Sequence, residues 1–387
     1  MPTRFLPRLS RRQWLGTTLL ALFECELAQP QASDPEPVLA SLVRRPLQFP
    51  RDRGSHPDMA IEWWYVTGEL RSQRQLFGFQ LTFFRSRVPS TQSMTSAFAA
   101  KQLIFAHAAV TDVAGKRLLH DQRIARSSGQ PAVDLAAARE TDTDVSLREW
   151  SLVRSNGMYL ARVLGQDFSF TLNFKETQPM LLQGDQGLSR KGPTAVQASY
   201  YYSLPHLSIA GELTLAGQKY GVTGRAWLDH EWSQSLLHPD AVGWDWIGVN
   251  LDDGSALTAF RLRTKSGTSL WAGGSWRVKG ATQAQVFGPE DVVFTAERLW
   301  KSPASSVNYP VQWAISVRHT AAITGLSAPW QHLTVRAMVD NQELDSRSST
   351  GAIYWEGLSE LLDEQGRVLG RGYLEMTGYA SPLRLYN

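Results

Sequence analysis

One stretch of the sequence, from Gly221 to Asp252, concentrates titratable and aromatic side chains. It contains His230 with Trp232 two positions later, and the next β-rich run places Asp245 between two tryptophans. An imidazole can hold or accept a proton near neutral pH, and a carboxyl group kept neutral by apolar surroundings can donate one. The stretch therefore predicts acid–base chemistry, with His230 and Asp245 as the candidate groups.

The alternation of residue types predicts where these side chains point. Successive side chains of a strand lie on opposite faces, so His230 and Trp232 share the face of the apolar even-numbered positions. Asp229 falls on the other face, whereas Asp245 shares its face with Ile247 and the apolar residues that follow. We therefore expect His230 and Asp245 to project from neighbouring strands into one apolar cavity. In the alternative interpretation, His230 is a hydrogen-bonded core histidine and Asp245 caps a strand or pairs with an arginine.

Composition excludes several classes of function. The chain has 387 residues with 39 basic and 36 acidic side chains and no block of like charge, so a nucleic-acid-binding role has no electrostatic basis. Cys25 is the single cysteine, so no disulfide can form within the chain. The sequence has no cysteine and histidine spacing typical of a metal site, no glycine-rich phosphate loop and no serine elbow. It predicts neither a metal nor a cofactor.

The N-terminus has the pattern of an export signal. In residues 1–32 a basic start precedes a short apolar run, Trp14 to Phe23, and the segment from Ser10 to Leu15 resembles a twin-arginine signal. We expect a periplasmic or secreted protein; the open alternatives are an uncleaved signal that acts as a membrane anchor and a lipid anchor on Cys25. A proline-rich linker, residues 33–50, follows the signal.

The elements that must position the candidate residues are strands. Short alternating runs with Gly and Asn turns recur from residue 61 onwards, beginning with a hairpin of 61–70 and 76–85, and no long helical period appears. Residues 112–145 lack strand signals and are expected to form an irregular excursion or a short helix. The pattern predicts an all-β sandwich or barrel. Because more than 300 residues exceed one small barrel, we divide the chain into domains at 51–232 and 233–387.

Several motifs carry a resemblance to a known family. These are Ile61-Glu62-Trp63-Trp64-Tyr65 with Thr67-Gly68, Trp227-Leu228-Asp229-His230-Glu231-Trp232, Gly243-Trp244-Asp245-Trp246, Tyr354-Trp355-Glu356-Gly357, and the run from Gly372 to Tyr379. In this order they resemble the AttH/CrtC family, a lipocalin-like group that includes carotenoid 1,2-hydratases and predicted secreted hydrolases. The resemblance covers almost everything after residue 50, and it implies two lipocalin-like (calycin) β-barrels side by side.

The resemblance also implies roles for two residues. In the hydratases, the histidine and tryptophan of a D-H-x-W motif are implicated in catalysis, which corresponds to His230 and Trp232 here. The tyrosine and aspartate that the hydratases use further along have no match that this sequence identifies, so Asp245 is the candidate acid on strand parity alone. Hydration protonates one alkene carbon before water attacks the cation, which Trp244 and Trp246 could stabilise.

Three functions remain open. The first is hydration of a C=C bond in an isoprenoid or polyene. The second is hydrolysis of a lipid-like ester, with water activated by His230 and a carboxylate. The third is a non-enzymatic carrier of a hydrophobic molecule, linked to an ABC exporter. A hydrophobic small molecule is the expected partner in each case, with association at a membrane surface or an ABC transporter as a further expectation; the sequence does not predict the oligomeric state.

Further residues are candidates for ligand binding, and each also has a structural interpretation. Glu62 could serve the site or pair with an arginine at a barrel rim, and His107 could be a hydrogen-bonded core residue. Tyr202 lies in a tyrosine run that is also typical of strand packing, and His56 with Pro57 is expected to shape the entry of the chain. The remaining ligand-binding candidates are Asp229, Trp64, Tyr65, Trp244 and Trp246.

Overall fold

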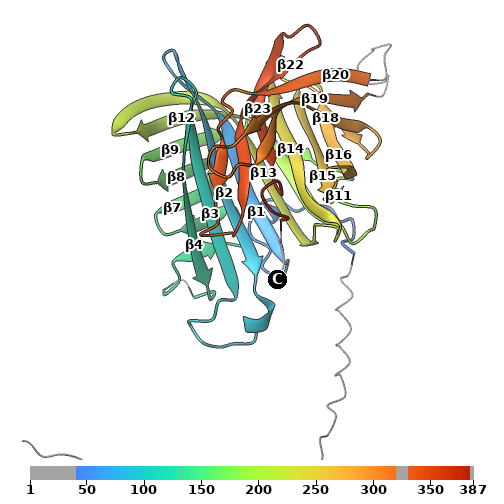
Figure 1. Ribbon diagram of the computed structural model, residues 1–387. Helices are drawn as coiled ribbons and strands as arrows, with labels where there is room; N and C mark the ends of the chain where they lie inside the picture. The colour runs from blue at the N-terminus through green and yellow to red at the C-terminus, as the bar shows by residue number, and fades with distance from the viewer. Residues whose placement is uncertain (1–40, 131, 320–329, 384–387) are drawn as a thin grey trace, which may run out of the picture. The chain divides into compact units, whose positions relative to one another are not determined.

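A computed structural model describes residues 41–130, 132–319 and 330–383, and these residues are built almost entirely of antiparallel strands (Figure 1). The predicted all-β class is therefore confirmed. The expected export signal, residues 1–32, and the first part of the expected linker lie outside the described residues. Within the described ranges, no helix is both long enough and apolar enough to span a bilayer.

The first sheet has thirteen strands in the order β4-β3-β2-β1-β13-β12-β9-β8-β7-β6-β5, and β10 and β11 both pair with β12. Because β4 also contacts β5 and β6, the sheet curves into a nearly closed barrel, drawn blue to green in Figure 1. Its strands are β1 (Ile61–Ser72), β2 (Gln75–Arg87), β3 (Gln102–Asp112), β4 (Arg117–Ser127), β5 (Ala136–Ala138), β6 (Asp144–Leu147), β7 (Trp150–Ser155), β8 (Met158–Leu164), β9 (Phe168–Lys175), β10 (Leu181–Leu182), β11 (Leu188–Arg190), β12 (Ala198–Leu215) and β13 (Gln218–Ser235). Two short 3-10 helices, η1 (Arg51–Arg53) and η2 (Pro89–Thr91), belong to its loops.

The second sheet has ten strands in the order β17-β16-β15-β14-β23-β22-β20-β19-β18, and β21 pairs with β22. It forms a half-barrel, drawn yellow to red in Figure 1. Its strands are β14 (Ala241–Leu251), β15 (Ala256–Thr264), β16 (Ser269–Arg277), β17 (Gln285–Phe287), β18 (Val292–Lys301), β19 (Asn308–Arg318), β20 (Trp330–Ala337), β21 (Glu343–Asp345), β22 (Ile353–Leu362) and β23 (Val368–Met376). The architecture agrees with the two lipocalin-like barrels that the sequence resemblance implied.

Alternation explains most of these strands. In β9, for example, Phe168, Phe170, Leu172 and Phe174 are buried while the residues between them are more exposed. The inward side chains of the first sheet form one continuous core, and those of the second sheet form another. Each barrel therefore has its own apolar interior. Alternate side chains of a strand point to opposite faces of the sheet, and the buried face of each sheet is the apolar one.

The expectation for residues 112–145 is wrong. This segment contains β4 and β5 and the start of β6 rather than an irregular excursion or a helix. β4 pairs along its whole length with β3, from Arg117 opposite Asp112 to Ser127 opposite Gln102. Its side chains are mostly half-buried on both faces, so the strand lacks the apolar alternation by which sequence patterns identify strands.

Candidate functional site

Three central strands of the first sheet bring the inward-facing candidates together. In the register of β1 with β13, Trp64 lies opposite His230 and Glu62 lies opposite Trp232. On the other side of β13, Tyr202 of β12 lies opposite His230. All five side chains are buried in the interior of the first barrel, as strand parity predicted for His230 and Trp232.

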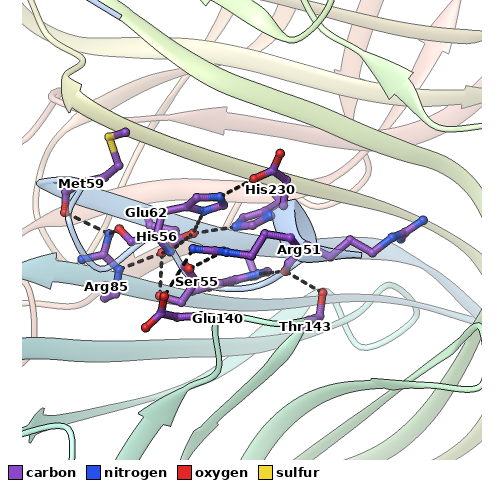
Figure 2. Close-up of polar contacts among 12 residues, drawn as sticks. Arg51, Ser55, His56, Met59, Glu62, Arg85, Glu140, Thr143 and His230 are labelled. Carbon is purple, nitrogen blue, oxygen red and sulfur yellow. Dashed lines mark hydrogen bonds and ion pairs between the residues drawn. The ribbon is translucent and has the colours of Figure 1, made fainter. Parts of the chain in front are cut away.

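Glu62 is the centre of the polar contacts there (Figure 2). Its carboxylate accepts hydrogen bonds from the Ser55 hydroxyl (3.0 Å), His56 Nδ1 (2.7 Å), Arg85 Nε (2.8 Å) and His230 Nε2 (2.9 Å), and from the His56 amide. Burial opposes ionisation, but the charge of Arg85 and the imidazole hydrogen bonds hold the pKa of Glu62 well below its usual range. Glu62 is therefore an ionised acceptor that joins two imidazoles.

The two imidazoles carry different protonation states. Burial lowers the pKa of His230 to about 4 although Glu62 opposes the shift, so this ring is neutral at physiological pH. Because Glu62 can only accept, His230 Nε2 carries the proton, and Nδ1 is left to accept from the Tyr202 hydroxyl at 3.2 Å.

His56 has the opposite character. Burial disfavours its charge, but hydrogen bonds to Asp52 and Glu62 outweigh burial and raise the pKa of His56. Its Nε2 lies 3.0 Å from Asp52 Oδ1, and Arg45 in turn binds both oxygens of Asp52 at 2.7 and 3.0 Å. Tyr202, His230, Glu62, His56 and Asp52 thus form one continuous hydrogen-bonded chain, which we call the relay.

Aromatic faces fix the two rings of the relay. His56 stacks on Trp232 with ring centroids 3.9 Å apart and planes 5° apart, and His230 stacks on Trp64 at 4.7 Å. Trp64 is itself held by a hydrogen bond from its Nε1 to the carbonyl of Arg53. An imidazolium against an indole face is stabilised by the ring quadrupole, which favours the charged form of His56.

His56, Glu62 and His230 also offer the atom types that bind transition metals, and their candidate atoms lie within 4.8 Å of one another. The arrangement favours protons over a metal ion for two reasons. His56 Nδ1 and His230 Nε2 already donate to Glu62. The buried guanidinium of Arg85 already neutralises the charge of Glu62. A metal would have to displace two protons and then lie beside a guanidinium.

Residues that contact the relay line a cleft of about 350 Å³ at the end of the first barrel. Ser55 and Arg85, which both contact Glu62, form part of its wall together with Pro57, Lys101 and Ile104. The cleft thus connects the surface with the groups that hold Glu62, and the site has both acid–base groups and an opening beside them.

Comparison with known proteins identifies the family. The family model described as AttH-like matches residues 41–379. The chain belongs to the AttH-like family. A solved structure of a protein assigned to AttH from Nitrosomonas europaea is 44% identical, covers 88% of this chain and 100% of its own, and superposes with a TM-score of 0.78. Kievitone hydratase from Nectria haematococca shares the fold at 15% identity, with a TM-score of 0.64 over 87% of this chain and 94% of its own. No curated protein matches the chain.

In this AttH-like protein, the expected meeting of His230 and Asp245 does not occur. Asp245 is buried in the second barrel, where it accepts from Arg261 Nε (2.8 Å) and the Tyr379 hydroxyl (2.9 Å) and pairs with Arg263 at 3.0 Å. The cause is topological: β14 pairs with β15 and β23 and not with β13, so its inward face looks into the other core. The carboxylate that contacts His230 is Glu62, and the role proposed for Asp245 remains a prediction.

Four ligand-binding candidates lie instead in an apolar cluster between the two sheets. This cluster, the seam, contains Tyr65 of the first sheet and Trp246 of the second, with Trp244 packed against it. Tyr65 and Trp246 meet edge to face at 5.4 Å. Asp229 faces the same side and accepts from Trp227 Nε1 at 2.6 Å, and burial raises the pKa of Asp229 to about 7.

The seam also holds carboxyl groups that the sequence did not single out. Glu356 and Glu375 lie opposite each other in β22 and β23. Burial and their mutual proximity raise the pKa of Glu356 well above its usual range. Burial and the nearby charges of Asp229 and Glu231 raise the pKa of Glu375 to about 7. The pair therefore retains a proton near neutral pH.

His107 lies apart from the relay. Its Nδ1 is 2.8 Å from the Tyr354 hydroxyl and its Nε2 is 2.9 Å from Ser349 Oγ, so it joins the first sheet to the second. Burial lowers the pKa of His107 to about 3, which keeps the ring neutral. These contacts match the alternative given for His107 in the sequence analysis, a hydrogen-bonded core residue.

Sequence reasoning missed His56, Asp52, Ser55 and Arg85 as members of the site. His56 was expected only to shape the chain entry, yet both its ring nitrogens contact carboxylates. One signal was available: in the hairpin of β1 and β2, Arg85 lies directly opposite Glu62.

Proposed function

We propose that this AttH-like protein binds an apolar isoprenoid- or polyene-like molecule at the first barrel and adds water to, or removes it from, a C=C bond. The observation that carries the proposal is one buried carboxylate, Glu62, holding two imidazoles whose pKa values are shifted in opposite directions. Pairs of titratable groups with divergent pKa values are the arrangement that acid–base enzymes use. The fold shared with kievitone hydratase supports this proposal.

The relay supplies both proton transfers that hydration requires. His56, as an imidazolium, holds the proton that is transferred to the alkene carbon, which leaves a cation on the neighbouring carbon. Water then bonds to the cation and loses a proton, which His230 Nδ1 can receive through the Tyr202 hydroxyl. His230 then passes its Nε2 proton through Glu62 to His56, so no proton is gained or lost overall, and transfer of the remaining His230 proton from Nδ1 to Nε2 restores the starting tautomer.

The test is incorporation of labelled water. The full chain is incubated with an acyclic isoprenoid that has a trisubstituted C=C bond in ¹⁸O-water, and the product is examined by mass spectrometry. His56→Gln and His230→Gln should each lower turnover about 100-fold or more, the contribution of a positioned acid or base. His332→Gln, on an exposed histidine of the second sheet, is the matched control. Undiminished turnover in both relay variants would refute the proposal.

Asp245→Asn tests the site that strand parity predicted. If the relay performs the reaction, the folded fraction of this variant turns over normally, because Asp245 contacts Arg261, Arg263 and Tyr379 in the other barrel. A loss of turnover equal to that of His230→Gln, with the fold intact by circular dichroism, would favour Asp245 as the acid instead.

A carrier is the second candidate, because His230 and Trp232 are completely buried and present no surface to a ligand in this state. Native mass spectrometry that recovers an unaltered lipid, without turnover of any alkene, would support it. Ester hydrolysis is less favoured, because the serine at the site, Ser55, donates to Glu62 and not to an imidazole.

The proposal also places the protein outside the cytoplasm. Its support is the basic, then apolar, N-terminal pattern of residues 1–32. Fractionation of cells that express the full chain, with N-terminal sequencing of the product, tests this location and shows whether the signal is cleaved.

A further inference from the structure

Four large apolar side chains are exposed at the end of the first barrel that carries the cleft. Met94 (50% exposed) and Phe98 (75%) belong to the loop between β2 and β3, and Val133 (46%) and Leu135 (54%) belong to the connection between β4 and β5. The loop between β2 and β3 projects beyond the strands at the bottom of Figure 1. Exposed apolar side chains gathered at one place, beside an opening, indicate an interaction surface.

Arg126 holds the two loops together. Its NH1 donates to the Ala97 carbonyl at 3.2 Å, its guanidinium lies 5.2 Å from the centre of the Phe98 ring, and it pairs with Asp134 at 3.7 Å. The side chain of Asp134 is buried and accepts from the Ser128 amide and hydroxyl at 2.9 Å. These contacts hold Phe98 of the first loop close to Asp134 of the second, which lies between Val133 and Leu135 in the sequence.

The same loops border the cleft. Gln92 and Lys101 come from the first loop, Ser128 and Gly129 come from the second, and Ser127 is the last residue of β4; all five line the cleft. Residues 88–101 include no acidic side chain and end at Lys101, whereas Arg126 is paired with Asp134, and Glu140 on the cleft wall is paired with Arg51. The surface therefore combines apolar tips with positive charge and is complementary to a layer of anionic headgroups.

We propose that this end of the first barrel docks on an anionic lipid bilayer, with Phe98, Met94, Val133 and Leu135 inserted among the headgroups and the cleft facing the membrane. A bilayer suits these tips because it accepts separate side chains without a complementary rigid surface. An apolar ligand then passes between bilayer and cleft without crossing water. The inference deepens the proposed function by assigning the route of the ligand, but its test measures membrane contact rather than turnover, so the two can fail separately.

A fluorescent label that senses polarity tests the proposal. In a Cys25→Ser background, which removes the single natural cysteine, an environment-sensitive dye is attached to the full chain at Phe98→Cys or, as the matched control, at Leu299→Cys. Leu299 is 61% exposed on β18 of the second sheet. Vesicles of phosphatidylcholine with phosphatidylglycerol should shift the emission to the blue at position 98 and leave it unchanged at position 299. Because the label reports locally, binding by the N-terminal segment does not produce the expected difference.

Charge provides a second readout on the same label. Lys101→Gln should raise the lipid concentration at half-maximal response about fivefold, the effect of one cation near an anionic surface. Lys219→Gln, on an exposed lysine at the turn between β12 and β13, should leave it unchanged. The proposal is overturned by equal responses at positions 98 and 299, or by no response at position 98. It is also overturned if protein concentration alone shifts the emission, because the surface would then be a contact between protein molecules.

Discussion

Substitution of Glu62 by glutamine is the sharpest test of the relay's architecture, because it keeps the shape of the side chain and removes its charge. In the parent protein, the buried guanidinium of Arg85 has Glu62 as its ion-pair partner at 2.8 Å. Removing one partner of a buried ion pair costs about 3–5 kcal/mol, since the other charge stays buried without compensation. The new amide NH₂ also faces N–H donors of His56, His230 or Arg85, and an unsatisfied buried donor costs about 1–3 kcal/mol more.

We therefore expect Glu62→Gln to lower the free energy of unfolding by at least about 4 kcal/mol. Urea unfolding followed by tryptophan fluorescence measures the change, and with a slope of about 3 kcal/mol/M the midpoint falls by more than about 1 M. Glu360→Gln is the control, because Glu360 pairs with Arg336 and Arg371 at 3.1 Å near the surface, where such pairs contribute about 0–1 kcal/mol. A cost for Glu62→Gln no larger than that of the control would refute the view that Glu62 anchors the site as an ionised group.

Two further predictions concern protons. The pKa of Glu375 is raised from 4.5 to about 7, so the folded state binds a proton that the unfolded chain has already released, and stability should fall as the pH rises through that window. Glu375→Gln should flatten this fall, measured as the thermal midpoint between about pH 4.5 and 7; an unchanged slope would contradict the argument. In the relay, ¹⁵N NMR should find His230 neutral and His56 protonated at about pH 6, and two rings that titrate together near 6.5 would exclude the assigned roles.

The fold was largely predictable because most strands show alternation of buried and exposed side chains. The hairpin expected at 61–70 and 76–85 is β1 and β2. β4 escaped prediction because neither of its faces is fully buried, so its apolar residues do not alternate. Local pattern identifies a strand only where burial differs between its faces.

The site was predictable in part for the same reason. Parity placed His230 and Trp232 inside the first barrel, and it also placed Asp245 inside a barrel. The alternation of residue types does not show which strands pair with each other. Because β13 and β14 are consecutive in the sequence, we expected them to be neighbours, but they belong to different sheets. His56 lies outside any strand, so its contact with Glu62 depends on how the segment after η1 folds against the barrel and has no periodic signal.

The concentration of titratable residues in β13 follows from its position. The strand pairs with β1 on one side and β12 on the other, which fixes its register, because a slip of one residue would exchange its two faces. His230 and Trp232 then point into the first barrel, while Asp229 and Glu231 point towards the seam and the second sheet. Four consecutive residues, 229–232, thus supply side chains both to the relay site in the first barrel and to the acidic groups at the seam. Because Asp229 in the seam directly precedes His230 in β13, the thermal and NMR titrations described above should be measured on the same samples and compared.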